Sequence, residues 1–169
     1  EEDFLSAELE VVPAGKAREA GLDRSMVLGY GQDDRVCAFT SLAAMLEIGQ
    51  TERTACCILV DKEEIGSEGT TGMQSAIFTD LIDELAASFG VSSAAIRAHS
   101  KCLSADVTAA YDPNYPEVCE KNNSVFLSCG AGIMKFTGAR GKSGSNDANA
   151  EFLAYLRKLF DENGVVWQT

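Results

Sequence analysis

One stretch constrains the fold of this chain more than any other. An apolar run at residues 55–60 leads into Asp61 and, two residues later, into the pair Glu63 and Glu64, before a turn rich in Gly, Ser and Thr. A short apolar run bounded by turn residues predicts a buried strand, and carboxylates at a strand end lie at the sheet edge where open α/β sheets hold their sites. Because successive strand residues point to opposite faces, we expect Glu63 and Glu64 to have different roles. The alternative is a solvated acidic turn.

The rest of the chain alternates between two hydrophobic periods. Apolar residues recur every three or four positions over 33–48 and 73–89, which predicts helices. Further helices are predicted at 92–99 and at 147–161, the latter capped by Asp147. Strands are predicted at 4–12, 55–60, 102–107, 124–127, 132–136 and 165–167, and a loop at 14–32. This alternation predicts an α/β fold with helices on both faces of a sheet.

Composition excludes several partners. The chain has 169 residues, with 14 basic against 26 acidic residues and a net charge of −12, which argues against binding to nucleic acid or to an anionic membrane. Its 46% of hydrophobic residues fit one folded domain. No run of 18 apolar residues and no leader-like start is present, so we expect a cytoplasmic protein.

The cysteines are interpreted as structural thiols. There are six of them, without a Cys-x-x-Cys pair, and three lie in apolar runs. Disulfides are rare in cytosolic proteins. The sequon at 122–124 requires a secretory route and is expected to be unused.

Carboxylates also stand at two other junctions between elements. Asp33 and Asp34 stand at the N-terminus of the helix predicted over 33–48, and Asp106 closes the strand predicted over 102–107. An N-cap role explains one carboxylate at the helix start, but not two. Carboxylates gathered at one end of a sheet form a plausible site for divalent cations, which relieve their mutual repulsion.

Two other sites are rejected. Gly141-Lys142-Ser143 resembles the end of a phosphate-binding loop, but Phe136 stands where that motif requires glycine. A serine hydrolase is excluded because no Gly-x-Ser-x-Gly elbow exists and the single histidine, His99, supplies no triad.

Three ordered motifs resemble the aspartyl aminopeptidase / vacuolar aminopeptidase I family of dinuclear zinc enzymes. They lie at 32–39, at 61–67 and at 104–106 with 112–115, and the likeness continues through 138–144 and 159–163. The resemblance implies a three-layer α/β/α sandwich with a mixed, mostly parallel sheet. It also implies that 13–169 is part of a catalytic domain and that 1–12 is a strand at the junction with an inserted dimerisation domain. The full-length protein would act on peptides, as a homo-oligomer that is dodecameric in this family.

The resemblance also implies roles for individual residues. Asp33 would bridge two divalent metal ions, zinc in the parent protein, with Glu64 and Asp106 as terminal ligands. Glu63 would be the general base that takes a proton from a metal-activated water. The Asp33-Asp34 peptide would be cis. Lys135 would line the substrate pocket, although an exposed strand lysine is an alternative interpretation.

The chain departs from the family pattern in its histidines. Relatives complete their metals with a His-x-Asp motif upstream and a histidine near the C-terminus, and His99 matches neither position. Carboxylates without imidazole favour magnesium or calcium over zinc. We therefore expect the chain alone to bind zinc weakly and to be inactive, and a non-catalytic scaffold is the alternative function. Residues 138–144 look closer to the branch that accepts neutral and apolar N-terminal residues, with acidic ones left open.

Overall fold

The computed structural model describes residues 2–139 and 143–169. The chain forms two compact units, residues 1–107 and residues 108–169. The predicted boundary between 12 and 13 concerns a junction with an inserted domain, and it stays a prediction.

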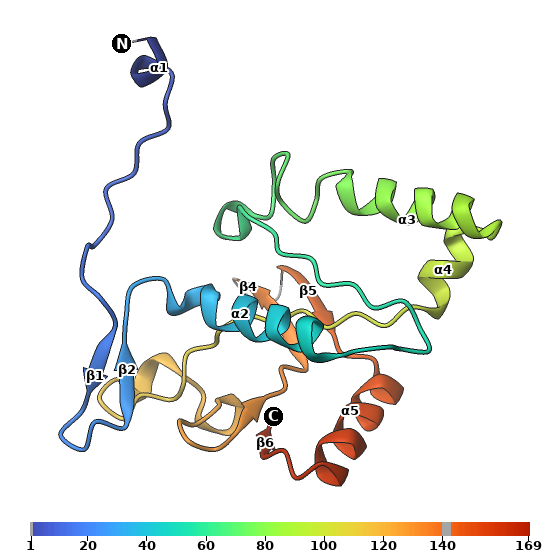
Figure 1. Cartoon of the computed structure of the whole chain (residues 1–169). Coiled ribbons are helices and arrows are strands. Elements are labelled where there is room, and N and C mark those ends of the chain that lie inside the picture. Colours follow the sequence, from blue (N-terminus) through green and yellow to red (C-terminus); the bar gives the residue numbers. More distant parts are fainter. Residues whose placement is uncertain (1, 140–142) are drawn as a thin grey trace. The chain divides into compact units, whose positions relative to one another are not determined.

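The first unit begins with the short helix α1, which a hairpin and three longer α-helices follow (Figure 1). The sequence predicted only a loop at 14–32, but β1 and β2 pair antiparallel there, with Arg18 opposite Leu28. Gly21 lies in the turn between them at φ 88°, a left-handed backbone conformation that residues with a side chain rarely adopt. The bounds of the elements are α1 Glu2–Leu5, β1 Arg18–Ala20, β2 Met26–Leu28, α2 Gln32–Glu47, the 3-10 helix Glu63–Ile65, α3 Ile77–Phe89 and α4 Ser93–His99.

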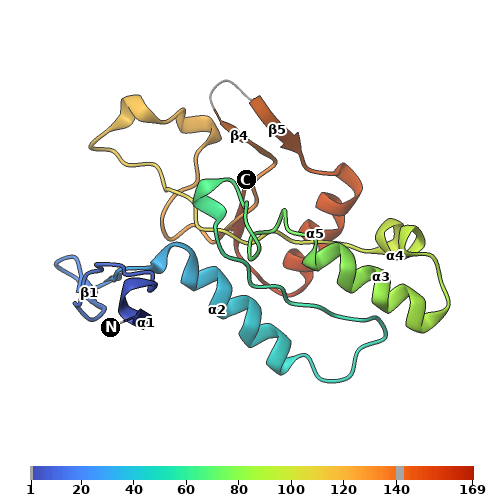
Figure 2. The ribbon, with the colours of Figure 1, turned by 90° about the horizontal axis from the view of Figure 1, so that it is seen from above.

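Helices α3 and α4 form a packed corner of the first unit (Figure 2). The helix α3 ends at Gly90, whose left-handed backbone lets its N–H reach the carbonyls of Ala86 and Ala87. Ala86 is only 3% exposed. An ion pair of 3.6 Å between Arg97 and Asp83 links the two helices. The predicted helix at 92–99 is confirmed, whereas the one at 73–89 begins only at residue 77.

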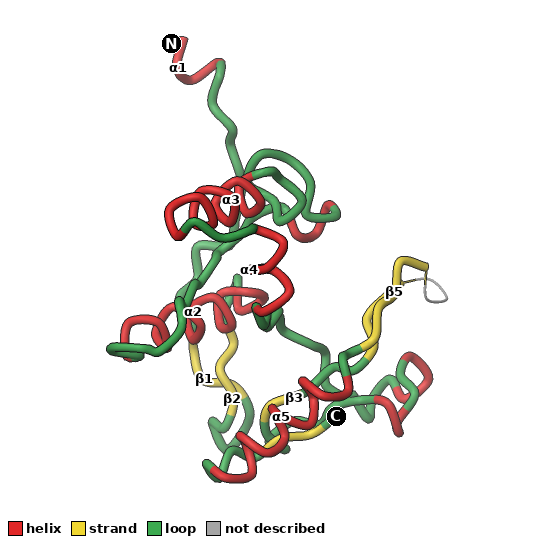
Figure 3. The backbone as a smooth tube through the Cα atoms, turned by 90° about the vertical axis from the view of Figure 1, so that its right-hand side faces the viewer, coloured by secondary structure: helices red, strands yellow, loops and turns green. Residues whose placement is uncertain are grey.

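The second unit contains short strands and one long helix. Strand β3 pairs parallel with β6, and β4 pairs antiparallel with β5 (Figure 3). The side chain of Gln168 accepts from the N–H of Phe126 at 2.8 Å and donates to its carbonyl at 2.9 Å, which joins the chain end to an earlier loop. The bounds are 3-10 helices Pro116–Val118 and Lys121–Asn123, β3 Ala131–Gly132, β4 Phe136–Ala139, β5 Ser143–Asp147, α5 Ala150–Glu162 and β6 Trp167–Gln168.

The cap predicted for the last helix is wrong by two residues. Asn149, not Asp147, caps α5, and its side-chain oxygen accepts from the N–H of Phe152 at 2.8 Å. Asp147 ends β5 and pairs with Phe136 in the hairpin. A capping side chain must stand immediately before the first helical turn, which Asn149 does.

Several predicted strands are not formed. The segment predicted as a strand at 4–12 begins inside α1 and continues irregularly, and 55–60 and 102–107 have no strand partner within the described residues. In place of one sheet, the described strands make three separate two-stranded sheets, one of them parallel. The reason is that a strand is held by the backbone hydrogen bonds of a neighbour, and an apolar run alone does not supply one.

The apolar faces of the helices are largely open. The residues predicted to form the inner face of α2 include Val36, Phe39 and Leu42, and these are 47%, 71% and 43% exposed. Helices of globular proteins normally bury such a stripe. Ala86 is the buried hydrophobic side chain of the described residues. No helix in the described part of the chain has the length and apolar character needed to cross a bilayer.

Candidate metal centre

Two adjacent carboxylates, those of Asp33 and Asp34, lie at the start of α2. Gly31 adopts a left-handed backbone at φ 79°, and the regular helix follows only after Asp33 and Asp34, whose backbone angles are not helical. The peptide bond between these two residues is cis, which confirms the prediction. Both carboxylates therefore stand before the first regular turn, and neither acts as an ordinary side-chain cap.

Three carboxylates converge at this point. Asp33, Asp34 and Asp106 each offer an oxygen, and these atoms all lie within 4.8 Å of one another. We call these three residues the aspartate cluster. Asp33 and Asp106 are exposed, and Asp34 is half-buried. One oxygen of Asp34, Oδ1, is shielded from solvent and has no hydrogen-bond partner among the described residues. The cluster thus joins residues from two distant segments of the first unit.

The donor set of the aspartate cluster fits a divalent cation. Zinc–oxygen bonds of about 2.0–2.2 Å allow two ligand oxygens to lie up to roughly 4.4 Å apart, and calcium bonds of about 2.3–2.6 Å allow roughly 5 Å. The 4.8 Å limit on the cluster is compatible with that range. Carboxylates this close repel one another, and a cation would offset the repulsion. Asp33 and Asp106 were predicted as metal ligands, and the structure brings them together.

The charge of the cluster acts on a neighbouring thiol. Burial, followed by a hydrogen bond and the negative charge of Asp34 and the charges of Asp106 and Asp33, raises the pKa of Cys37 to about 11. This thiol therefore stays protonated at neutral pH. All six cysteines are free thiols, as the sequence predicted. Cys56, however, is exposed and is not the small core residue that its apolar run predicted.

Glu63 and Glu64 lie in a separate part of the first unit. They form the 3-10 helix that follows Lys62, whose backbone is left-handed at φ 64°, and both side chains are exposed. In the described part of the chain, neither belongs to the aspartate cluster. Their assigned roles as base and ligand stay predictions.

Two other predicted residues lie elsewhere. Lys135 is exposed between β3 and β4 in the second unit, and its carbonyl accepts from the N–H of Ala148 at 2.7 Å. Its substrate-binding role stays a prediction. His99 ends α4, accepts a hydrogen bond from Arg53 at its carbonyl, and is outside the cluster among the described residues, as expected. The motifs at 138–144 lie partly outside the described residues.

Sequence reasoning gave no metal role to Asp34. Its position directly beside Asp33 was the available signal, because two adjacent carboxylates exceed what an N-cap requires. The structure adds that its oxygen reaches the other two residues.

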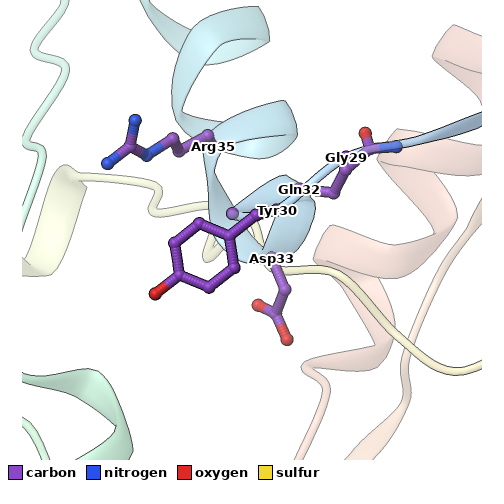
Figure 4. Close-up of a pocket in the computed structure, with 6 residues that line it drawn as sticks. Gly29, Tyr30, Gln32, Asp33 and Arg35 are labelled. Atoms are coloured by element: carbon purple, nitrogen blue, oxygen red, sulfur yellow. The ribbon is translucent and has the colours of Figure 1, made fainter. Parts of the chain in front are cut away.

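A hollow adjoins Asp33 and opens to solvent (Figure 4). Its volume is about 520 Å³. In Figure 4 the carboxylate of Asp33 and the guanidinium of Arg35 extend in different directions from the start of α2, with the ring of Tyr30 between them. The hollow is lined by Gly29, Tyr30, Gly31, Gln32, Asp33 and Arg35. Small molecules can therefore reach the exposed carboxylate of Asp33.

Comparisons with known proteins show which family the chain belongs to. The model of the family described as aminopeptidase I zinc metalloprotease (M18) matches residues 1–169. A probable M18 family aminopeptidase 1 of Clostridium acetobutylicum is 55% identical over 100% of this chain and 37% of its own length. One of Thermotoga maritima is 43% identical over 99% of this chain and 38% of its own length. The chain thus spans a little over a third of these relatives.

Solved structures agree with the sequence relatives. The crystal structure of aminopeptidase I from Clostridium acetobutylicum superposes with a TM-score of 0.89 at 55% identity, over 99% of this chain and 37% of that one. The crystal structure of an M18 aminopeptidase from Thermotoga maritima superposes with a TM-score of 0.88 at 42% identity, over 99% of this chain and 38% of that one. With a family model that matches from the first residue to the last, the chain belongs to the M18 family of aminopeptidase I zinc metalloproteases.

Proposed function

We propose that the full-length protein is a metal-dependent aminopeptidase that hydrolyses the first peptide bond of peptides. The aspartate cluster carries this proposal, because Asp33 and Asp106 come from distant segments and place their oxygens within 4.8 Å in a chain of a zinc metalloprotease family. Such convergence is what a cation site requires, because several carboxylate oxygens must reach one ion.

Each carboxylate has a distinct role in this proposal. Asp33 would hold both of two divalent metal ions, Asp106 would hold one of them, and Glu64 would hold the other. Asp33 and Asp106 are supported by their convergence. Glu64 is supported by its place at the end of an apolar run and by the motif it shares with the family.

Glu63 handles the proton. Divalent cations, when bound, lower the pKa of a coordinated water and polarise the substrate carbonyl. The carboxylate of Glu63 would accept a proton from the attacking water and would then donate it to the leaving amine. Glu63 can do this because its side chain is exposed and makes no hydrogen bond or ion pair among the described residues.

The metals are expected to be two zinc ions in the full-length protein. Zinc prefers nitrogen and sulfur donors, and the carboxylates of this chain supply only oxygen. Histidine ligands are therefore proposed to lie outside this chain, one for each metal. The chain alone is proposed to bind zinc weakly and to be inactive.

Substrate and context follow from the family resemblance. We propose neutral or apolar N-terminal residues as the preferred substrates, with acidic residues possible, and Lys135 as part of the substrate pocket. The complete domain is proposed to be a three-layer α/β/α sandwich with a mixed, mostly parallel sheet. A dodecamer in the cytoplasm is the proposed assembly and location.

Hydrolysis of chromogenic amides tests the function. The full-length protein is compared with its Glu63→Gln variant on leucyl and aspartyl amides. Cleavage that depends on Glu63 supports the enzyme, and the ratio of the two substrates reports the preference. A parent protein that cleaves equally well without the Glu63 carboxylate would refute the assignment.

A non-catalytic scaffold is the second candidate. Two observations favour it for the chain alone: Glu63 and Glu64 lie outside the aspartate cluster within the described residues, and the apolar face of α2 is open. A full-length protein that binds zinc and assembles, but cleaves neither amide, would support this candidate instead.

A further inference from the structure

The loop at residues 61–74, here named the acidic loop, closes on itself by backbone hydrogen bonds. The N–H of Asp61 donates to the carbonyl of Thr71 at 3.1 Å, and the N–H of Ser67 donates to the carbonyl of Lys62 at 2.8 Å. The N–H of Gln74 donates to the carbonyl of Ser67 at 3.1 Å. These bonds link both ends of the loop, so the loop holds its shape through its own contacts.

One side chain adds a further link in the acidic loop. The amide nitrogen Nε2 of Gln74 donates to the carbonyl of Gly66. Gly66 ends the 3-10 helix that carries Glu63 and Glu64, and it adopts a left-handed backbone at φ 98°. Gln74 therefore connects the end of this short helix to the segment that enters α3.

The acidic loop is also too tight for a side chain at one position. Gly72 is buried, and a Cβ there would lie inside contact distance of the carbonyl oxygens of Ser67 and Glu68. These atoms are backbone, so they cannot turn aside as a flexible side chain would. The close approach brings Gln74, two residues later, to Gly66.

No side-chain contact among the described residues orients the two glutamates. In the described part of the chain, neither Glu63 nor Glu64 makes a side-chain hydrogen bond or an ion pair, and both are exposed. The backbone of the short helix therefore sets where the two side chains begin, and the N–H groups of Gly66 and Ser67 already hold this backbone through the carbonyl of Glu63. A further contact on this backbone restrains the starting points of both carboxylates.

We propose that Gln74 is a positioning residue for Glu63 and Glu64. It holds the carbonyl of Gly66 and so restrains the short helix, which keeps one carboxylate available for the metal and its neighbour available for the proton. This inference rests on the roles proposed for Glu63 and Glu64. Groups that orient metal ligands typically affect metal affinity or activity by about 10- to 100-fold.

The test compares two matched substitutions in the full-length protein. Gln74→Met keeps the length of the side chain and removes the donor. Gln50→Met is the control, because it makes the same chemical change at an exposed glutamine with no described hydrogen bond of its side chain. Zinc affinity is measured by competition with a chelator, and kcat and KM with a leucyl amide. We expect Q74M to weaken zinc binding by about 10-fold and to lower kcat more than it changes KM, with Q50M unchanged.

A double-mutant cycle separates positioning from a general structural effect. If Gln74 acts through Glu64, the zinc affinity lost in Q74M will not be lost again in a Glu64→Ala background. Likewise, Q74M will not lower kcat further in a Glu63→Gln background. Additive losses in both cycles, or a Q74M protein that behaves like Q50M, would overturn the proposal.

Two further variants serve as controls for Q74M. Gln74→Lys restores a donor of similar reach and is expected to recover most of the zinc affinity. Gln74→Ala repeats the loss of the donor if Q74M does not fold. Failure of the proposed function is recognised separately, because a Glu63→Gln protein with full activity would refute the role of Glu63 whatever Q74M does.

Discussion

The aspartate cluster and the acidic loop hold their carboxylates in different ways. In the cluster, Asp33 and Asp106 come from distant segments and bring oxygens within 4.8 Å of one another. In the acidic loop, Glu63 and Glu64 are neighbours, and the loop's own hydrogen bonds set its shape. The first arrangement depends on the path of the chain through the first unit. The second is local, and its carboxylates stay outside the cluster among the described residues.

The acidic loop and the aspartate cluster therefore depend on different parts of the chain. The hydrogen bonds that close the loop lie within fourteen consecutive positions, 61–74. A metal centre built from both parts also requires that the loop be carried to the cluster. We expect segments outside this chain to complete that arrangement, together with the histidine ligands.

The largest effect is expected from removing the base. Glu63→Gln in the full-length protein keeps the size of the side chain but removes its ability to accept a proton. We expect kcat to fall by about 10²- to 10⁴-fold, with little change in KM. Steady-state kinetics with leucyl amides measure this. Zinc content measured by elemental analysis serves as the control, because it should not change.

Substitution in the cluster is expected to act on the metal. Asp106→Asn in the full-length protein replaces a charged proposed ligand by a neutral one, and Asp33→Asn does so for the proposed bridging ligand. Zinc affinity is expected to fall by at least about 10-fold for either variant, with the larger loss for Asp33. Competition with a chelator provides the measurement. Unchanged zinc affinity in both variants would remove the cluster from the metal centre.

Gly72→Ala is expected to disturb the acidic loop and leave the cluster intact. The added Cβ meets the backbone carbonyl of Ser67, so the loop must open. Overpacking of this kind costs about 1–3 kcal/mol of unfolding free energy. Thermal unfolding of the full-length protein checks the cost. Binding of calcium to the chain alone checks the cluster, and a loss of more than about two-fold in the Gly72→Ala chain would show that the two parts are not independent.

The smallest effect is expected in the chain alone. Calcium or magnesium should bind to the aspartate cluster, and Asp106→Asn should weaken that binding. Glu64→Gln should change it by less than about two-fold, because Glu64 lies outside the cluster within the described residues. Isothermal titration measures all three proteins. Two tightly bound zinc ions in this chain alone would contradict the expected need for outside ligands.

The sequence predicted the local elements that depend on short-range patterns. The helical period ended by Gly90 predicted α3 but placed its start at residue 73 in place of 77; the end was right because spacing and a left-handed cap are local properties. The carboxylates Asp33 and Asp106 were recognised from their places at element junctions. The role of Asp34 in the cluster was missed, because only the folded chain shows where its oxygen points.

The strands were predicted less well. The apolar run at 55–60 has the composition of a buried strand but has no partner within the described residues. In the opposite case, the hairpin of β1 and β2 has no strong period, and pairing between Arg18 and Leu28 reveals it. Strand formation depends on a neighbour that can lie anywhere in the sequence.

By itself, the sequence determined the family, the helices α2 to α5 and the residues available for chemistry, because each of these depends on patterns within short stretches of sequence. The tertiary structure alone decided which carboxylates meet. Asp34 joined Asp33 and Asp106, while Glu63 and Glu64 stayed in the acidic loop among the described residues. The physical reason is that the approach of like charges depends on the packing of distant segments, and no local pattern encodes that distance.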